Sequence, residues 1–175
     1  MTKIRKYGAF LCVAVLVFLS GCTQSSRFGM QELSRRISIE NEKYAFTVEG
    51  AFLSDGFWHI PFSLVQTDDL LMSCKEDENG NLLQILLTAE KDTAPAADFV
   101  AFSKLLTQVF FGVSSYEAAA ITQNAGLTDE SVLFADHTGT QTQGRYSFTF
   151  FSTPVSVTTI LTYDDAIVVT ENESH

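Results

Sequence analysis

The spacing of apolar side chains changes along the chain, and each change predicts a different kind of element. Met30, Leu33 and Ile37 recur every three or four positions, which is typical of one amphipathic helix of about twelve residues. From Tyr44 the apolar side chains occupy every second position, which predicts a β-strand that continues to Leu53. Three further strands are predicted over residues 57–66, 70–75 and 82–88.

The pattern then returns to the helical period. An apolar stripe from Phe99 to Phe110 predicts a helix that ends at Gly112. Ser114 followed by Glu117 has the spacing of a capping box, so a second helix is expected to begin here and to end at Gly126. Strands are predicted again over residues 132–135, 145–151, 155–163 and 166–170.

The predicted order is α-ββββ-αα-ββββ, which indicates an α+β fold: one antiparallel sheet of about eight strands, with the helices packed on one face. Residues 30–171 form this single domain, and residues 172–175 are a short tail. An offset of 88 residues pairs Trp58 with Tyr146 and Ile60 with Phe148. This pairing suggests a duplication of two halves, 30–90 and 91–171, although chance agreement between apolar strand positions explains it equally well.

The first segment has the pattern of a secretory signal peptide. Lys3, Arg5 and Lys6 are followed by an uncharged apolar run from Ala9 to Leu19. About eleven residues rise roughly 16 Å as a helix, which is half of a hydrocarbon core of about 30 Å. A permanent membrane span is therefore not expected.

The end of this segment, Leu19-Ser20-Gly21-Cys22, resembles the lipobox of bacterial lipoproteins. The resemblance implies that residues 1–21 are removed and that Cys22 carries two or three acyl chains, which suffice for stable anchoring. Residues 22–29 then form a lipidated tether, and the domain lies on the extracytoplasmic face of the cell membrane. The alternative is an ordinary secreted protein in which Cys22 lies near the cleavage site by chance.

The net charge limits which molecules can bind the protein, and the cysteine content limits which disulfides can form. The chain of 175 residues has a formal net charge of −10, and removal of residues 1–21 leaves eight Lys and Arg against 21 Asp and Glu, a net charge of −13. This charge repels phosphate, so no nucleic acid partner is expected. Cys12 leaves with the signal peptide and Cys22 is lipidated, so Cys74 has no partner and is predicted to be a buried apolar side chain.

No catalytic or metal-binding pattern is found. His59, His137 and His175 are far apart in the sequence, and the acidic run 76–78 lacks the ligand spacing of a calcium loop, so it is interpreted as a charged hairpin tip. Neither a metal nor a cofactor is expected, and the protein is predicted not to be an enzyme. A hydrolase built from dispersed Asp, Glu and His remains an alternative, which a cleft holding His137 beside two carboxylates would favour.

The alternation of strand residues leaves one sheet face uncovered. If Trp58, Ile60 and Phe148 face the helices, the opposite face forms a candidate interaction surface. The leading hypothesis is a non-enzymatic lipoprotein that binds an envelope protein through this face. The alternatives are an ordinary solvated sheet and a small-ligand-binding module. The candidate residues are Phe57, His59, Ser63, Ser147, Thr149 and Phe151.

The predicted domain is similar in architecture to the repeated helix-plus-four-strand units of beta-lactamase-inhibitor-type proteins. It also resembles small uncharacterised α+β envelope lipoproteins, in the helix pair ending at Gly126-Leu127 and in the strand Gly144-Arg145-Tyr146-Ser147-Phe148. These resemblances imply a fold and an anchor, and they imply no activity and no binding residue.

Overall fold

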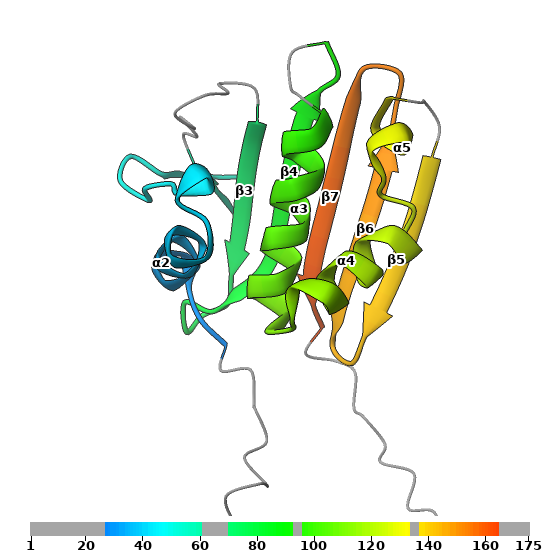
Figure 1. Ribbon diagram of the computed structural model, residues 1–175. Coiled ribbons are helices and arrows are strands. Elements are labelled where there is room, and N and C mark those ends of the chain that lie inside the picture. Colours follow the sequence, from blue (N-terminus) through cyan, green and yellow to red (C-terminus); the bar gives the residue numbers. More distant parts are fainter. Residues whose placement is uncertain (1–26, 61–69, 93–95, 134–136, 165–175) are drawn as a thin grey trace, which may run out of the picture.

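The computed structural model describes residues 27–60, 70–92, 96–133 and 137–164, and in these residues the chain forms one antiparallel sheet covered by helices on a single face (Figure 1). The described sheet has seven strands, where the sequence predicted about eight. The predicted α+β class and the placement of the helices on one face are therefore confirmed. The predicted duplication stays a prediction.

The first half supplies one helix, a short 3₁₀ helix and four strands. Their bounds are α2 (Met30–Glu40), η1 (Glu42–Tyr44), β1 (Phe52–Ser54), β2 (Phe57–Ile60), β3 (Leu70–Glu76) and β4 (Leu82–Glu90). The predicted charged hairpin tip lies between β3 and β4, and Gly80 in its turn has a φ of 74°, a conformation that residues other than glycine rarely adopt.

The second half supplies the remaining helices and strands: α3 (Ala96–Phe111), α4 (Ser115–Asn124), α5 (Asp129–Leu133), β5 (His137–Gln143), β6 (Tyr146–Ser152) and β7 (Ser156–Tyr163). The predicted helix ends are confirmed. Gly112 has a φ of 67° directly after α3. The Ser114 hydroxyl accepts from the Glu117 N–H at 3.3 Å, while the Glu117 carboxylate accepts from the Ser114 N–H at 2.9 Å, which completes the capping box.

The strands lie in the order β1-β2-β3-β4-β7-β6-β5, and every neighbouring pair is antiparallel. The two halves of the chain meet in the middle, where β4 pairs with β7 from Gln84↔Thr162 to Glu90↔Ser156. The sheet therefore ends in two edge strands of unequal length, the three-residue β1 and the seven-residue β5.

The core lies between the sheet and the helices. Phe99, Phe102 and Leu106 of α3 and Phe148 and Phe150 of β6 are fully buried in one apolar cluster. Full burial of a large apolar side chain stabilises a fold by roughly 1.5–3 kcal/mol, so this layer is the main source of stability. Cys74 is also buried, as predicted, and burial raises the pKa of its thiol, which leaves it protonated and unreactive.

Three predictions about local structure were wrong. Residues 44–51 form no strand, because the Tyr44 ring stacks on Phe102 with centroids 5.1 Å apart and its hydroxyl donates to Asp98 at 3.1 Å, so the chain turns inward here. Residues 132–133 belong to the helix α5, where Val132 is buried. The strand β5 was not predicted, because its sequence HTGTQTQ lacks apolar alternation.

Other predictions fall on residues outside the described parts. Residues 61–66 of the second predicted strand lie there, as does the whole predicted strand 166–170.

The domain begins earlier than predicted. Phe28 is buried, its carbonyl accepts from the Leu82 N–H at 2.9 Å, and the Arg36 guanidinium lies 4.2 Å from the centre of its ring. Residues 27–29 of the predicted tether are thus part of the domain. Residues 23–26 lie between Cys22 and this described part of the domain.

Candidate functional site

The strand register places five of the six predicted surface residues on one face of the sheet, the face opposite the helices. Phe57 and His59 lie on β2, and Ser147, Thr149 and Phe151 lie on β6. The sixth residue, Ser63, lies outside the described residues. Strands β3, β4 and β7 separate β2 from β6, so the two predicted groups do not touch.

Residues that were not predicted join the two groups into one surface. The register runs His59↔Ser73↔Leu86↔Ile160↔Thr149↔Thr140 straight across six strands. A neighbouring row runs Leu71↔Thr88↔Thr158↔Phe151↔Thr138. We call this surface the open face. Its central residues could be found only from the strand order, because no local pattern indicates that β4 lies beside β7.

Threonine hydroxyl groups on the open face form hydrogen bonds with one another across neighbouring strands. The Thr88 and Thr158 hydroxyls lie 3.1 Å apart, and those of Thr140 and Thr149 lie 3.0 Å apart. Such cross-strand pairs hold the register of a sheet and contribute roughly 0.2–1 kcal/mol each. The face is therefore a fixed array of polar and apolar side chains.

Apolar side chains stand among these hydroxyls. Leu71 is 64% exposed and Phe52 is 59% exposed, while Leu86, Ile160 and Phe151 are half-buried. Charged side chains are scarce: within the described strands, this face carries Lys75 and Glu90, although the whole chain has 21 Asp and Glu and 11 Lys and Arg.

His59, a candidate residue of the interaction surface, is half-buried and makes two contacts. Its Nδ1 lies 3.0 Å from the Ser73 hydroxyl, and its ring stacks on Phe52 with centroids 5.2 Å apart. A serine nucleophile also needs an acid that orients the histidine and N–H donors for the oxyanion. Within the described residues no carboxylate contacts His59, so this contact is a cross-strand pair without the rest of a catalytic triad.

His137, which the hydrolase alternative requires, lies at the start of β5 against the backbone of α4. A Cβ atom added to Gly126 would come within 2.0 Å of its Nε2, so the imidazole fills the space that the glycine leaves. Its ring centroid lies 5.7 Å from that of Phe150. Nε2 is buried and has no hydrogen-bond partner among the described residues, in which no cluster of metal-ligating side chains occurs either.

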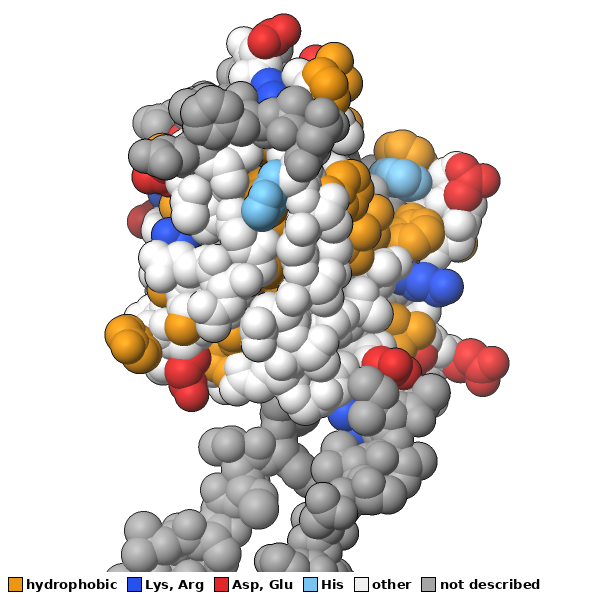
Figure 2. All heavy atoms as spheres, turned by 90° about the vertical axis from the view of Figure 1, so that its right-hand side faces the viewer, with side chains coloured by type: hydrophobic (Ala, Val, Ile, Leu, Met, Phe, Trp, Pro, Cys, Tyr) orange, Lys and Arg blue, Asp and Glu red, His pale blue; other side chains and the backbone are white. Residues whose placement is uncertain are grey.

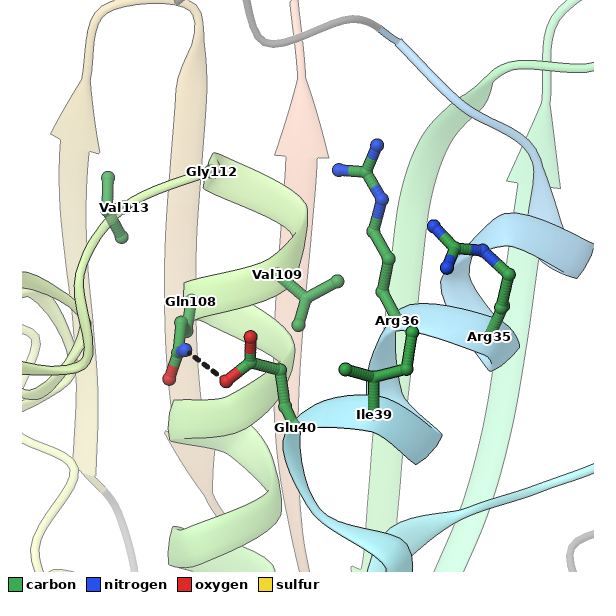
Figure 3. Close-up of a pocket in the computed structure, with 8 residues that line it drawn as sticks. All are labelled: Arg35, Arg36, Ile39, Glu40, Gln108, Val109, Gly112 and Val113. Carbon is green, nitrogen blue, oxygen red and sulfur yellow. Dashed lines mark hydrogen bonds between the residues drawn. The ribbon is translucent and has the colours of Figure 1, made fainter.

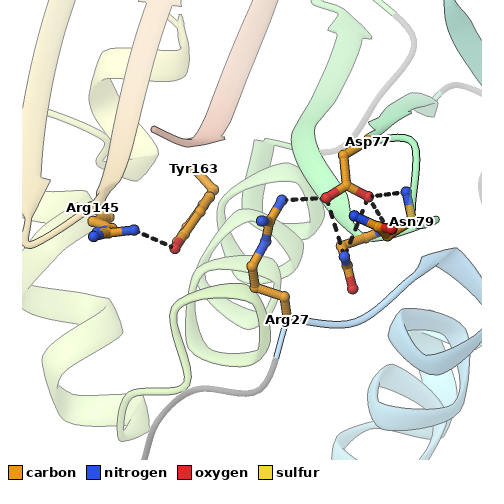
Figure 4. Close-up of polar contacts among 6 residues, drawn as sticks. Arg27, Asp77, Asn79, Arg145 and Tyr163 are labelled. Atoms are coloured by element: carbon orange, nitrogen blue, oxygen red, sulfur yellow. Dashed lines mark hydrogen bonds and ion pairs between the residues drawn. The ribbon is translucent and has the colours of Figure 1, made fainter. Parts of the chain in front are cut away.

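The acidic hairpin tip ties the start of the domain to the sheet (Figure 4). The Asp77 carboxylate accepts from the backbone N–H groups of Asn79 at 2.9 Å and Asn81 at 2.8 Å, and from the Arg27 guanidinium at 2.8 Å. These hydrogen bonds, with the charge of Arg27, lower the pKa of Asp77. The Arg27 guanidinium also lies 4.6 Å from the centre of the Tyr163 ring, at the end of β7.

These residues around Arg27, which we call the Arg27 cluster, lie where the described part of the domain begins and ends. Residue 27 and residue 164 both lie at the same end of the sheet, beside the β3–β4 turn (Figure 1). A lipid attached a few residues before Arg27 would hold this end of the sheet toward the membrane.

Two hollows lie beside α2. One, of about 330 Å³, separates α2 from α3, and the Glu40 carboxylate accepts from the Gln108 amide at 2.9 Å across it (Figure 3). Arg35 and Arg36 line it, and both guanidinium groups donate to Glu32, which lowers the pKa of that carboxyl to about 2. The arginines are thus already paired with an internal anion.

The larger hollow, of about 560 Å³, lies where α2 begins. It is lined by the Trp58 ring, by Met30 and by the carboxylate of Glu76, which accepts from the Met30 N–H at 2.9 Å. Its volume is in the range of small-molecule pockets, and its wall combines an aromatic ring with a fixed negative charge.

No single helix among the described residues is long and apolar enough to cross a membrane; α3 and α4 meet that criterion only as a pair, bent by 116°. The chain matches no family model, no curated protein and no solved structure. The open face, the Arg27 cluster and the two hollows are therefore interpreted from their own chemistry.

Proposed function

We propose that this protein is an extracytoplasmic lipoprotein, anchored by a lipid on Cys22, that binds another envelope protein through the open face and catalyses no reaction. The scarcity of charge on this face is the main support. Protein interfaces are depleted of charged residues and enriched in aromatic side chains at their centre. In a chain with a net charge of −10, a broad surface that carries only Lys75 and Glu90 among the described strands has this character.

The proposed anchor agrees with where the domain begins. Five residue steps lead from Cys22 to Arg27, which span at most about 18 Å when fully extended. The domain is then held close to the membrane with its strands pointing away from it. The open face stands beside the membrane surface, where another anchored protein can reach it.

The test compares two exposed pairs of apolar residues on opposite sides of the molecule. Phe52 and Leu71, on the open face, are 59% and 64% exposed, while Tyr116 on α4 and Ile39 on α2 are 83% and 66% exposed. The lipidated protein is used as bait in detergent-solubilised envelope, either unchanged, as Phe52→Ser/Leu71→Ser, or as the matched control Ile39→Ser/Tyr116→Ser.

We expect a stoichiometric partner that the control pair retains and that the open-face pair loses by about tenfold or more. Truncation of a residue that anchors an interface costs more than about 1 kcal/mol, so the loss of two anchors exceeds the roughly 1.4 kcal/mol that corresponds to a factor of ten. A partner that both pairs retain contradicts binding through the open face. Mass spectrometry of the membrane-associated protein that finds no acyl chain on Cys22 contradicts the anchor.

The hollow beside Trp58 favours a second candidate function, the binding of a small ligand. Its aromatic wall and the Glu76 carboxylate suit a small apolar or cationic molecule. Quenching or enhancement of the fluorescence of Trp58, the single tryptophan of the chain, reports such binding directly. A ligand screen in which no compound changes this fluorescence would argue against the second candidate.

A further inference from the structure

At every second residue of β5, the backbone N–H and C=O groups on the outer edge have no partner among the described residues. β5 and β6 are joined by the two-residue loop Gly144-Arg145, in which Gly144 has a φ of 59°, as in a type II′ turn. The flanking pair Gln143↔Tyr146 therefore exchanges backbone hydrogen bonds, and so does every second pair from there. The N–H and C=O groups of Thr138, Thr140 and Thr142 point away from β6.

These three threonines are also exposed, and no hydrogen bond from their backbone to any described residue occurs outside the β5–β6 ladder. Figure 2 looks onto this edge, whose middle consists of backbone and uncharged side chains, with Asp, Glu, Lys and Arg toward its margins.

Natural proteins protect sheet edges with charged side chains, proline, bulges or very short strands. The opposite edge follows this rule, because β1 has only three residues. β5 has seven residues in continuous register with β6, without a proline, a lysine or a carboxylate. A long, regular and unprotected edge is the surface that an additional strand requires.

We propose that an extended, uncharged segment of another envelope protein pairs with β5 and continues the sheet as its next strand. This inference rests on the proposed lipid anchor. The partner would exchange up to six backbone hydrogen bonds with Thr138, Thr140 and Thr142. Its side chains on one side would continue the threonine rows of the open face, so short or β-branched residues suit that side.

A second copy of this chain does not fit the same position when both copies are anchored in the proposed orientation, with their strands pointing away from the membrane. Closed pairs of identical subunits are related by a twofold axis, which at a sheet edge pairs β5 with itself in antiparallel orientation and inverts one copy. The Arg27 cluster of the inverted copy then lies at the far end of the sheet.

The tether is too short for that arrangement. β4 and β7 lie beside each other over nearly the height of β5, and the nine residues of β4 rise about 27 Å from Leu82 to Glu90. The inverted copy would have to span at least this distance with a tether that reaches about 18 Å. The occupant of the edge is therefore a different protein, for which no such inversion is required.

The test measures hydrogen exchange of the β5 amides by mass spectrometry in the lipidated, full-length mature protein, first purified in detergent and then in native envelope membranes. Thr140→Pro removes the central outward N–H, and Thr140→Val is the matched control that keeps it. Proline is tolerated at an edge position whose N–H faces outward, and unchanged exchange in β6 and β7 confirms that the variant folds.

We expect the amides of Thr138, Thr140 and Thr142 to exchange rapidly in the purified protein and at least about tenfold more slowly in membranes. Thr140→Pro should abolish the slowing at Thr138 and Thr142, and Thr140→Val should retain it. Equal exchange in both preparations would overturn the proposal. Slow exchange of these amides in the purified protein would also overturn it. If this protection of β5 depends on protein concentration, a second copy pairs with β5. If it does not, the chain's own terminal segments do.

The result separates this inference from the proposed function. If the open-face variants lose their partner while membranes leave β5 exchange unchanged, the proposed function stands and the added strand does not. If membranes slow β5 exchange while mass spectrometry finds no acyl chain on Cys22, the pairing stands and the anchor fails.

Discussion

Replacement of Gly139 by alanine tests how closely α4 approaches β5. Gly139 lies in the middle of β5 and has an ordinary strand φ, so the substitution introduces no backbone strain. An added Cβ would come within 2.0 Å of the carbonyl oxygen of Ala125 and 2.8 Å of its carbonyl carbon. Ordinary carbon–oxygen contacts are about 3.3–3.6 Å, so the end of α4 and β5 must separate by more than about 1 Å.

This separation has a predictable cost, because the obstructing atoms belong to the backbone and cannot rotate away. Insertion of one carbon into a packed site typically destabilises a protein by about 1–3 kcal/mol, and we expect Gly139→Ala to lie at the upper end of this range. For a domain of this size, a loss of about 3 kcal/mol lowers the melting temperature by about 6–12 °C.

The assay is urea unfolding followed by circular dichroism, with thermal melting as a second measurement. Gln141→Ala is the matched control, since Gln141 lies two residues further along the same face of the same strand and is also half-buried. The control should change the free energy of unfolding by less than about 0.5 kcal/mol. A loss of less than about 0.5 kcal/mol for Gly139→Ala would refute the close approach of α4 to β5.

Three smaller predictions concern local contacts. Ser114→Ala should cost about 1 kcal/mol in urea unfolding, because it removes one half of the capping box of α4; a loss no larger than that of Ser115→Ala would contradict this. Hydrogen bonds lower the pKa of Glu32 to about 2 and also lower that of Asp77. These carboxylates stabilise the fold above the unfolded pKa of 4.5 for Glu32 and 3.8 for Asp77, and this stabilisation is lost as the pH falls toward 2. Melting temperatures recorded between pH 6 and pH 2 should therefore fall less steeply for Glu32→Gln than for the unchanged protein. The thiol of Cys74 should react with a thiol reagent only after urea unfolding, and rapid labelling of the folded protein would contradict its burial.

Parts of the fold were predictable because their cause is local. The ends of α3 and α4 follow from Gly112, Gly126 and the Ser114–Glu117 capping box, since backbone sterics and hydrogen bonds between near neighbours decide them. The burial of Cys74 follows from its place on the apolar side of a strand. In the candidate site, the alternation of β2 and β6 correctly placed Phe57, His59, Ser147, Thr149 and Phe151 on one face.

Other parts depended on contacts between distant segments. Tyr44 lies in a strand-like pattern, yet the ring of Phe102 and the carboxylate of Asp98, more than fifty residues away, draw it into the core. β5 lacks the apolar alternation of a strand because it lies at the edge and is covered by α4 on one side only. Thr138, Thr140 and Thr142 could be identified as candidates for pairing with a further strand only from the register of β5 with β6.

The sequence by itself determined the class of the fold, the end of α3, both ends of α4 and the parity of β2 and β6, because each of these depends on residues close together in the chain. The tertiary structure decided that β4 pairs with β7, which brings Leu86 beside Ile160 at the centre of the open face. It also decided that β5 forms the long exposed edge, while β4 and β7, the last described strands of the two halves, lie in the middle of the sheet. Strand order depends on which apolar surfaces bury one another across the whole domain, and the spacing of residues within one segment does not contain that information.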